Sequence, residues 1–234
     1  MEHRAEFTFS VIIPTSGRAS LRRTLRRLRR EDEGDIEVIV VADGARPRAE
    51  AIALGEAKAW PAIRYSEGPL TRNWGNAQRM LGIQQASGRY LMFIDDDDVT
   101  KRRAFSVIRR AVQTNPSRMI LFRMKRHGEK LWSRPEVAFG NVSTQQIVLP
   151  NLPGRVGSWL TNDRYQSDLD FIVECAALQG EPIWDRHVIA IVDPFRWSQP
   201  RSWLRPRVMR WRTRAKLGTR VRGLLRKRGS TDQS

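Results

Sequence analysis

The stretch RYLMFIDDDDVT, residues 89–100, joins an apolar segment directly to four consecutive carboxylates, Asp95 to Asp98. The apolar part predicts a buried strand, and the acidic run follows at the carboxyl end of that strand. Two carboxylates ~5 Å apart repel each other by about 3 kcal/mol at an effective dielectric near 20, so a cluster fixed there needs a counter-charge. A divalent cation would supply that charge, whereas the plain alternative is a solvated acidic turn.

Two further apolar runs lie upstream of this segment, at residues 7–14 and 36–44, and both are rich in β-branched residues. Such runs, closed by turn residues, are typical of buried parallel strands. Between them, Ser20 is placed to cap a helix that has one apolar stripe and is otherwise largely arginine. The stripe consists of Leu21, Leu25 and Leu28. The sequence therefore predicts a βαβ unit.

The alternation of strands and helices continues on both sides of the acidic run. Residues 74–87 predict a helix that Gly88 ends, and residues 118–124 predict a further strand. Between the acidic run and that strand, one helical face collects Ala104, Ile108, Ala111 and Val112. Strands and helices in alternation predict an α/β fold whose ligands lie beyond the carboxyl ends of the strands.

The 234 residues carry a net charge of +17, and this charge is unevenly distributed. Residues 195–234 contain eleven arginines and two lysines against a single acid, Asp232, and follow a proline-interrupted stretch. We therefore expect a body over residues 1–194 and a separate basic tail over 195–234. The single Cys175 excludes an internal disulfide and a multi-cysteine zinc site.

Three segments, in this order and at this spacing, resemble the nucleotide-binding half of family 2 glycosyltransferases: VIIPTSGR, VIVVADG and GNAQRMLGIQQASGRYLMFIDDDD. The resemblance covers roughly residues 9–100. It implies the GT-A fold, which has a Rossmann-like, mixed and mostly parallel sheet flanked by helices. It also implies a catalytic domain over 1–194, with a nucleotide-sugar-binding half over 1–100 and an acceptor half over 101–194.

The resemblance gives roles to the residues that match the motifs of the family. Those expected to contact the nucleotide-sugar, a UDP-sugar in the first place, are Pro14, Thr15, Arg18, Asp43, Arg79, Asp95 and Asp96. Those expected to bind Mn²⁺ or Mg²⁺ are Asp97 and Asp98. Such a cation neutralises the negative charge that develops on a diphosphate leaving group. Taken alone, Asp43 also fits an ordinary β-turn, and Arg79 a solvated helix arginine.

Inverting transfer also needs a general base that takes the proton of the acceptor hydroxyl. In YQSDLDFIVE, residues 165–174, Asp168 with Asp170 resembles the acidic pair that supplies this base in the family, and Asp168 is the first choice. The alternative is a helix N-terminus capped by Ser167, at which both carboxylates favour the helix dipole.

Two other kinds of protein also fit parts of the sequence, a phosphatase and a nucleic-acid-binding protein. MFIDDDDVT also fits the hydrophobic-Asp-x-Asp-x-Val pattern of haloacid-dehalogenase-like phosphatases, with Asp95 as nucleophile and Asp97 as acid/base. That family carries its motif on the first strand, whereas two strands are predicted before this one. A basic nucleic-acid-binding protein would account for the tail, but four carboxylates would repel phosphate. Trp159 is expected in the core rather than against a sugar ring, and His187 in a structural role rather than as a third metal ligand.

The tail has a basic amphipathic pattern that predicts helical segments. Arginines surround one apolar face formed by Leu204, Val208, Trp211 and Ala215. Such segments bind the headgroup region of anionic membranes. Since no secretory signal and no apolar run of ~20 residues occurs, we expect a cytoplasmic enzyme, peripheral on the inner face of the membrane. Its expected acceptor is a glycan or a lipid-linked sugar of the cell envelope, and a nucleic-acid partner is not expected.

Overall fold

The computed structural model describes residues 7–160, 167–192 and 194, which belong to one compact unit. The predicted helices of the tail lie outside the described residues. The helices are α1 (Leu21–Arg29), α2 (Pro47–Ala57), α3 (Asn76–Gln85), α4 (Ala104–Thr114), α5 (Ser167–Gln179) and the short 3₁₀ helix η1 (Thr144–Gln146). The strands are β1 (Phe9–Thr15), β2 (Ile36–Asp43), β3 (Ile63–Gly68), β4 (Tyr90–Phe93), β5 (Val99–Thr100), β6 (Ile120–Arg126), β7 (Glu129–Leu131), β8 (Ile147–Pro150) and β9 (Ile183–Val192).

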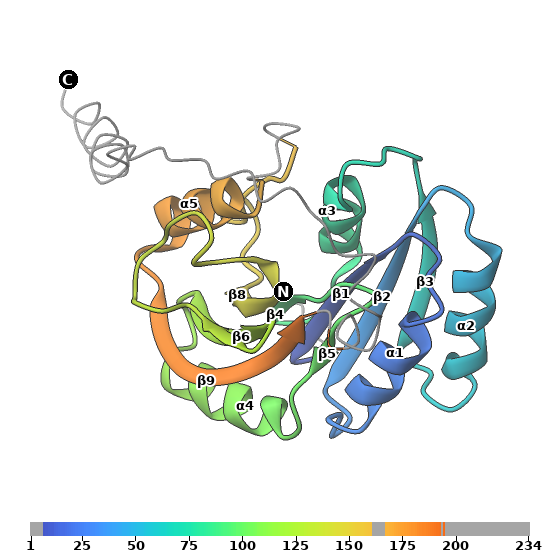
Figure 1. The fold of residues 1–234 in the computed structure, drawn as a ribbon, viewed down its shortest axis with the longest axis horizontal. Helices are drawn as coiled ribbons and strands as arrows, with labels where there is room; N and C mark the ends of the chain where they lie inside the picture. The colour runs from blue at the N-terminus through green and yellow to red at the C-terminus, as the bar shows by residue number, and fades with distance from the viewer. Residues whose placement is uncertain (1–6, 161–166, 193, 195–234) are drawn as a thin grey trace, which may run out of the picture. The chain divides into compact units, whose positions relative to one another are not determined.

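One mixed sheet runs through this unit in the order β3-β2-β1-β4-β8-β6-β9-β5, with β7 paired to β6 (Figure 1). The four neighbouring strands β3, β2, β1 and β4 are all parallel to one another. β8 is antiparallel to both of its neighbours, whereas β6 and β9 are parallel. The predicted fold class is confirmed, and so are the predicted βαβ unit and the helix and strand that follow the acidic run.

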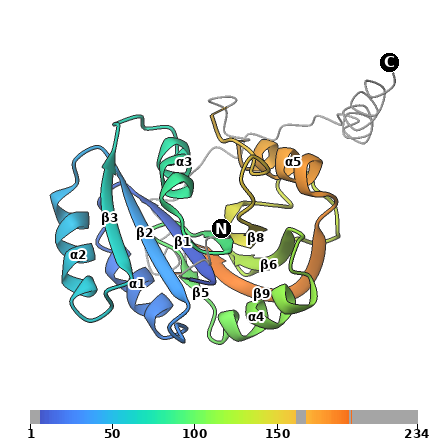
Figure 2. The same cartoon turned by 180° about the vertical axis from the view of Figure 1, so that it is seen from behind.

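Helices cover both faces of the sheet, because side chains along a strand point alternately to its two sides. Val11 and Val38 belong to a core that α1, α2 and α4 cover. Ile12 and Ile39 belong to a second core that α3 and α5 cover. Figures 1 and 2 show α3 and α5 together on one side of the sheet, away from α1 and α4. Among the described residues, no helix is long and apolar enough to cross a bilayer.

The arginine-rich helix α1 forms because its leucine stripe is completely buried. Leu21, Leu25 and Leu28 pack into the core on β1 and β2, and the arginines of the helix lie on its outer side. The predicted cap at Ser20 is wrong. Its backbone is already helical, with φ −59° and ψ −27°, and its side chain makes no capping hydrogen bond.

Two glycines bring the chain close against β1. A Cβ at Gly82 of α3 would lie 2.4 Å from Cγ2 of Ile12, and a Cβ at Gly88 would lie 2.6 Å from the backbone N of Ser10. α3 and the start of β4 can therefore pack tightly on β1. Because β1, β2 and β4 are parallel, their carboxyl ends meet at one edge of the sheet, where Thr15, Asp43 and the acidic run gather.

Candidate active site

Asp96 turns inward from the acidic run and holds the segment after β1. Its side chain is only 2% exposed, and Thr15 Oγ1 donates to Asp96 Oδ2 over 2.6 Å. The backbone N of Ser16 donates to the same oxygen over 3.2 Å, and Nη1 of Arg18 donates to Oδ1 over 2.9 Å. Asp96 therefore fixes the loop between β1 and α1 to the end of β4.

The other three carboxylates of the run point to one place. One side-chain oxygen each of Asp95, Asp97 and Asp98 lies within 4.8 Å of the others. Carboxylate oxygens are the ligands that Mg²⁺ and Mn²⁺ prefer, so the donor set fits a divalent cation. The sequence indicated Asp97 and Asp98 for the metal, and the structure adds Asp95 to this cluster.

Two arginines at the edge of the cluster supply positive charge. Nη2 of Arg79 lies 2.6 Å from Oδ1 of Asp95, and Nη1 of Arg18 lies 2.8 Å from Oδ2 of Asp97. The Arg79 side chain is 5% exposed, so the alternative of a solvated helix arginine is wrong. Burial lowers the pKa of Arg18, but the carboxylates of Asp96 and Asp97 more than offset this, and its pKa is raised overall.

Asp95 holds its proton more strongly than an ordinary aspartate. Burial raises its pKa, the guanidinium of Arg79 opposes the rise, and the negative charge of Asp168 adds to it. Asp168 lies in the first turn of α5, so the second half of the chain places a carboxylate within electrostatic reach of the acidic run.

Asp43 organises the loop that precedes α3. The backbone N of Thr71 donates to its Oδ1 over 2.7 Å, the backbone N of Arg72 donates to its Oδ2 over 3.1 Å, and Gln78 Nε2 donates to its Oδ1 over 2.9 Å. An ordinary turn would bond the carboxylate to its own segment, whereas this one reaches across to another loop. That loop ends at Gly75, where a Cβ would lie 2.7 Å from Cβ of Pro14.

The start of η1 orients Asp168. Ser143 Oγ donates to Asp168 Oδ2 over 2.8 Å, and the backbone N of Thr144 lies 3.4 Å from the same oxygen. Residues two apart on a helix do not face the same way, so Asp170 points in another direction. Ser167 is the first residue of α5 itself, and its hydroxyl donates to Asn76 Oδ1 over 3.2 Å, so the structure shows Ser167 bound to α3.

Gln145 of η1 is a site residue that sequence reasoning missed. Its Nε2 donates to Oδ2 of Asp95 over 3.0 Å and to Oδ2 of Asp98 over 2.9 Å. The segment Ser143 to Gln146 therefore contacts the acidic run through Gln145 and Asp168 through Ser143 and Thr144. The S-x-x-Q pattern of Ser143 and Gln146 marks the capping box that begins η1, but it does not indicate the contact of Gln145 with the acidic run.

Comparison with known proteins decides the family. The family model described as Glycosyl transferase family 2 matches residues 10–165, which is more than half of the chain. The chain belongs to glycosyltransferase family 2. A curated relative is the GalNAc(5)-diNAcBac-PP-undecaprenol beta-1,3-glucosyltransferase of Campylobacter jejuni, 29% identical over 100 residues that make up 42% of this chain and 32% of the relative.

Solved structures of similar fold include a mannosyltransferase. TarS of S. aureus superposes with a TM-score of 0.67 at 17% identity, over 79% of this chain and 36% of that one. The mannosyltransferase PcManGT of Pyrobaculum calidifontis, in complex with GDP-Man and Mn²⁺, superposes with a TM-score of 0.55 at 15% identity, over 79% of this chain and 56% of that one. This family 2 chain therefore spans about a third of the length of the curated relative and of TarS.

The remaining alternatives can now be compared with this family 2 structure. The phosphatase interpretation is wrong, because the chain belongs to another family and the acidic run follows β4 rather than the first strand. Trp159 is 1% exposed and stacks on Phe171 with ring centroids 3.5 Å apart, so its expected place in the core is confirmed. His187 is 64% exposed and bonds Asp185, outside the acidic cluster.

Proposed function

We propose that this protein is a metal-dependent, inverting glycosyltransferase that moves a hexosyl group from a nucleotide-diphosphate sugar to an acceptor hydroxyl. The observation that carries the proposal is the convergence of Asp95, Asp97 and Asp98 at the carboxyl edge of the sheet. Asp168, from the other half of the chain, is held by the same segment, Ser143 to Gln146, that contacts this cluster. Such an arrangement offers a metal-binding site and a separate carboxylate base.

The nucleotide-sugar-binding half, residues 1–100, would bind the nucleotide and its diphosphate. Asp97 and Asp98, with Asp95, would hold Mn²⁺ or Mg²⁺, which when bound offsets the negative charge of the leaving diphosphate. Arg18 has a half-exposed side chain next to Asp97 and is placed to bind a phosphate oxygen. Pro14, Thr15 and Asp43 lie at the ends of β1 and β2, where they would contact the nucleoside.

Asp168 would act as the general base. Its Oδ2 accepts hydrogen bonds from Ser143 and Thr144, which hold the carboxylate in place. It would take the proton of the acceptor hydroxyl as that oxygen attacks the anomeric carbon, opposite the leaving diphosphate. A single displacement of this kind inverts the anomeric centre.

Similar proteins support the substrate classes proposed. Solved structures of TarS hold UDP and UDP-GlcNAc, and that of PcManGT holds GDP-Man, so we propose a nucleotide-sugar donor and a UDP-sugar first. The curated relative is named for a substrate carried on undecaprenol diphosphate. We therefore propose an acceptor in a lipid-linked or cell-envelope glycan, reached by peripheral attachment to the inner face of the membrane through residues 195–234.

A metal-dependent binding experiment tests the proposal. The parent, Asp97→Asn/Asp98→Asn and a control, Glu129→Gln/Glu181→Gln, would be melted with UDP, GDP and their sugars, with and without Mn²⁺. Glu129 and Glu181 are exposed acids outside the cluster. We expect one nucleotide series to stabilise the parent and the control only when Mn²⁺ is present, and to leave the Asn variant unchanged. Equal stabilisation of all three proteins would contradict the proposal.

A further inference from the structure

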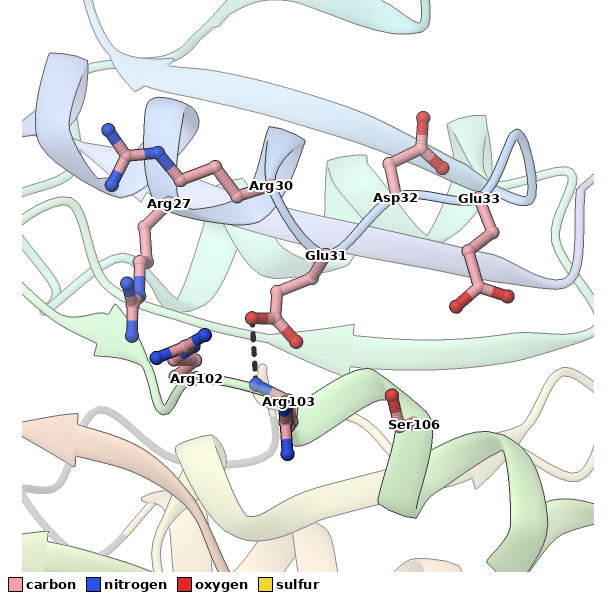
Figure 3. A pocket seen from close by; sticks show the side chains of 8 residues that line it. All are labelled: Arg27, Arg30, Glu31, Asp32, Glu33, Arg102, Arg103 and Ser106. Carbon is pink, nitrogen blue, oxygen red and sulfur yellow. Dashed lines mark hydrogen bonds between the residues drawn. The ribbon is translucent and has the colours of Figure 1, made fainter.

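A basic surface covers the outer side of α1 and the segment that leads into α4. It consists of Arg22, Arg23, Arg26, Arg27, Arg29, Arg30, Lys101, Arg102 and Arg103. All of these side chains are exposed except that of Arg27, which is partly buried. Nε of Arg27 donates to the carbonyl oxygen of Thr100 over 3.1 Å and so joins the two parts of the surface. Figure 3 shows the pocket of about 430 Å³ between them, into which side chains from both parts extend.

The acidic residues around this surface are engaged elsewhere. Glu31 accepts the backbone N–H groups of Arg103 and Phe105 at the start of α4. Asp32 accepts backbone N–H groups of its own turn and the Nε1 of Trp60, over 2.8 Å.

Two acids near the surface pair with Arg109, which is not part of it, and Glu56 pairs with the surface itself. Glu33 and Asp35 both pair with Arg109, at 2.8 and 2.6 Å. Glu56 pairs with Arg26 at 2.8 Å and lies 3.8 Å from Arg22. Within the described ranges, no ion pair is formed by Arg29, Arg30, Lys101, Arg102 or Arg103.

The arrangement is unfavourable for the fold by itself. Arg22, Arg26 and Arg30 follow one another at four-residue intervals, and like charges at that spacing destabilise a helix. The buried stripe of α1 would pack equally well with neutral or alternating charges on the outer side. The excess of cations is therefore suited to an anionic partner.

We propose that this basic surface docks the catalytic body onto a bilayer that contains anionic phospholipids. The choice of a bilayer over a nucleic acid rests on the proposed function, since a lipid-linked acceptor must be reached at the membrane. Clusters of this kind bind anionic leaflets, and each cation near the surface strengthens binding by about fivefold. None of the nine side chains is aromatic, so the surface offers no platform on which bases could stack.

α1 links this surface directly to the active site. On its buried side, Thr24 Oγ1 donates to the carbonyl oxygen of Asp98 over 2.7 Å. A helix with its side chains is ~10 Å across, so docking through the outer side of α1 would hold the acidic run about that distance from the lipid headgroups. The surface would then set the depth at which the site meets its acceptor.

Vesicle sedimentation with the full chain tests the proposal. The test variant is Arg29→Gln/Arg30→Gln/Arg102→Gln/Arg103→Gln. The matched control removes four exposed cations elsewhere on the body and is Lys125→Gln/Arg126→Gln/Lys130→Gln/Arg186→Gln. Binding to vesicles of phosphatidylglycerol and phosphatidylcholine should fall at least tenfold in the test variant and less than twofold in the control. A version with lysine at the four test positions should bind as the parent does, because it keeps the charges.

The outcomes separate this proposal from the proposed function. Mn²⁺-dependent nucleotide binding is measured on the same proteins and should match the parent in all variants, and a thermal midpoint no lower than that of the parent shows that each variant is folded. Equal vesicle binding by parent and test variant would contradict the proposal that the basic surface binds membranes, and it would leave the proposed function unaffected. The proposal is also overturned if the test variant binds vesicles normally but loses affinity for a short double-stranded DNA, or if the lysine version loses vesicle binding.

Discussion

Asp168 and Asp170 stand two residues apart in the first turn of α5, and Asp168 is tied to the segment that contacts the acidic run. If Asp168 is the general base, Asp168→Asn keeps the shape of the side chain but cannot accept the proton. We expect turnover to fall by on the order of 10²-fold or more, with donor affinity nearly unchanged. Single-turnover kinetics and donor titration measure the two quantities separately.

Asp170→Asn is the matched control for this substitution. It lies in the same helical turn and loses the same charge, so any effect on the helix dipole is shared. It should leave turnover within about threefold of the parent. A large loss at Asp170 together with normal turnover at Asp168 would move the role of base to Asp170.

The raised pKa of Asp95 predicts how stability depends on pH. Since its pKa is higher in the folded than in the unfolded chain, the folded state binds the proton more strongly. In the absence of metal, this stabilisation is complete at pH values below the pKa of an aspartate in the unfolded chain, which is near 4. It is lost as the pH rises through the pKa of Asp95 in the folded chain. Mn²⁺ binds the ionised carboxylate, so its stabilising effect should increase over the same interval.

Thermal midpoints with and without Mn²⁺, at pH values from about 4 to 7.5, test this dependence. In Asp95→Asn the contribution of this side chain is absent, so the metal-free protein should lose less stability with rising pH than the parent does. A thermal shift with Mn²⁺ that is constant across the range would contradict the prediction.

At the scale of single elements, two helix glycines have opposite environments. A Cβ at Gly55 in α2 would meet nothing within 4 Å, whereas a Cβ at Gly82 in α3 would lie 2.4 Å from Ile12. Gly55→Ala should stabilise the protein by about 0.5–1 kcal/mol through helix propensity. Gly82→Ala should destabilise it by ~1–3 kcal/mol, because α3 would be pushed off β1. Urea unfolding midpoints compare the two, and shifts in the same direction would contradict the packing argument.

The elements that sequence reasoning identified are those with a strong local signal. β-branched runs predicted β1 and β2, an apolar segment predicted β4, and the leucine stripe predicted α1. The helix α2 was missed although Pro47 begins it, at the first helical position that proline favours. β3, β5, β7, β8 and β9 were also missed. β5, β7 and β8 are short, and pairing such as that of β6 with β9 depends on residues far apart in the chain.

The active-site residues could be located to an edge of the sheet but not oriented. Asp96 binds Thr15, whereas Asp95 belongs to the acidic cluster. The run is neither a regular strand nor a helix, so its sequence has no periodicity from which the direction of each side chain could be predicted. Gln145 reaches Asp95 from fifty residues away, and local sequence carries no record of that contact. Side-chain direction in irregular segments is a tertiary property.

At the scale of the whole molecule, the basic tail over residues 195–234 carries twelve of the seventeen net positive charges. The prediction from its sequence is that the full chain sediments with anionic vesicles, weakly with neutral ones, and less at high salt. A chain truncated after residue 194 should bind nucleotide normally and vesicles more weakly, since it keeps only the basic surface on α1. Vesicle sedimentation of both chains over a salt series makes the comparison, and equal binding would rule out a membrane role for the tail.

The pairing of β5 with β9 also bears on how the chain folds. Val99, directly after the acidic run, pairs with Ile191, roughly ninety residues further on. The β3-β2-β1-β4 half can assemble from neighbouring βα units, and Thr24 of α1 already holds the carbonyl oxygen of Asp98 there. The strand that follows the acidic run gains its partner in the sheet only when β9 arrives. Closing so long a loop is slow, since its entropy is lost before the contacts form. We therefore expect the β5-β9 pairing to be among the last parts of the sheet to form.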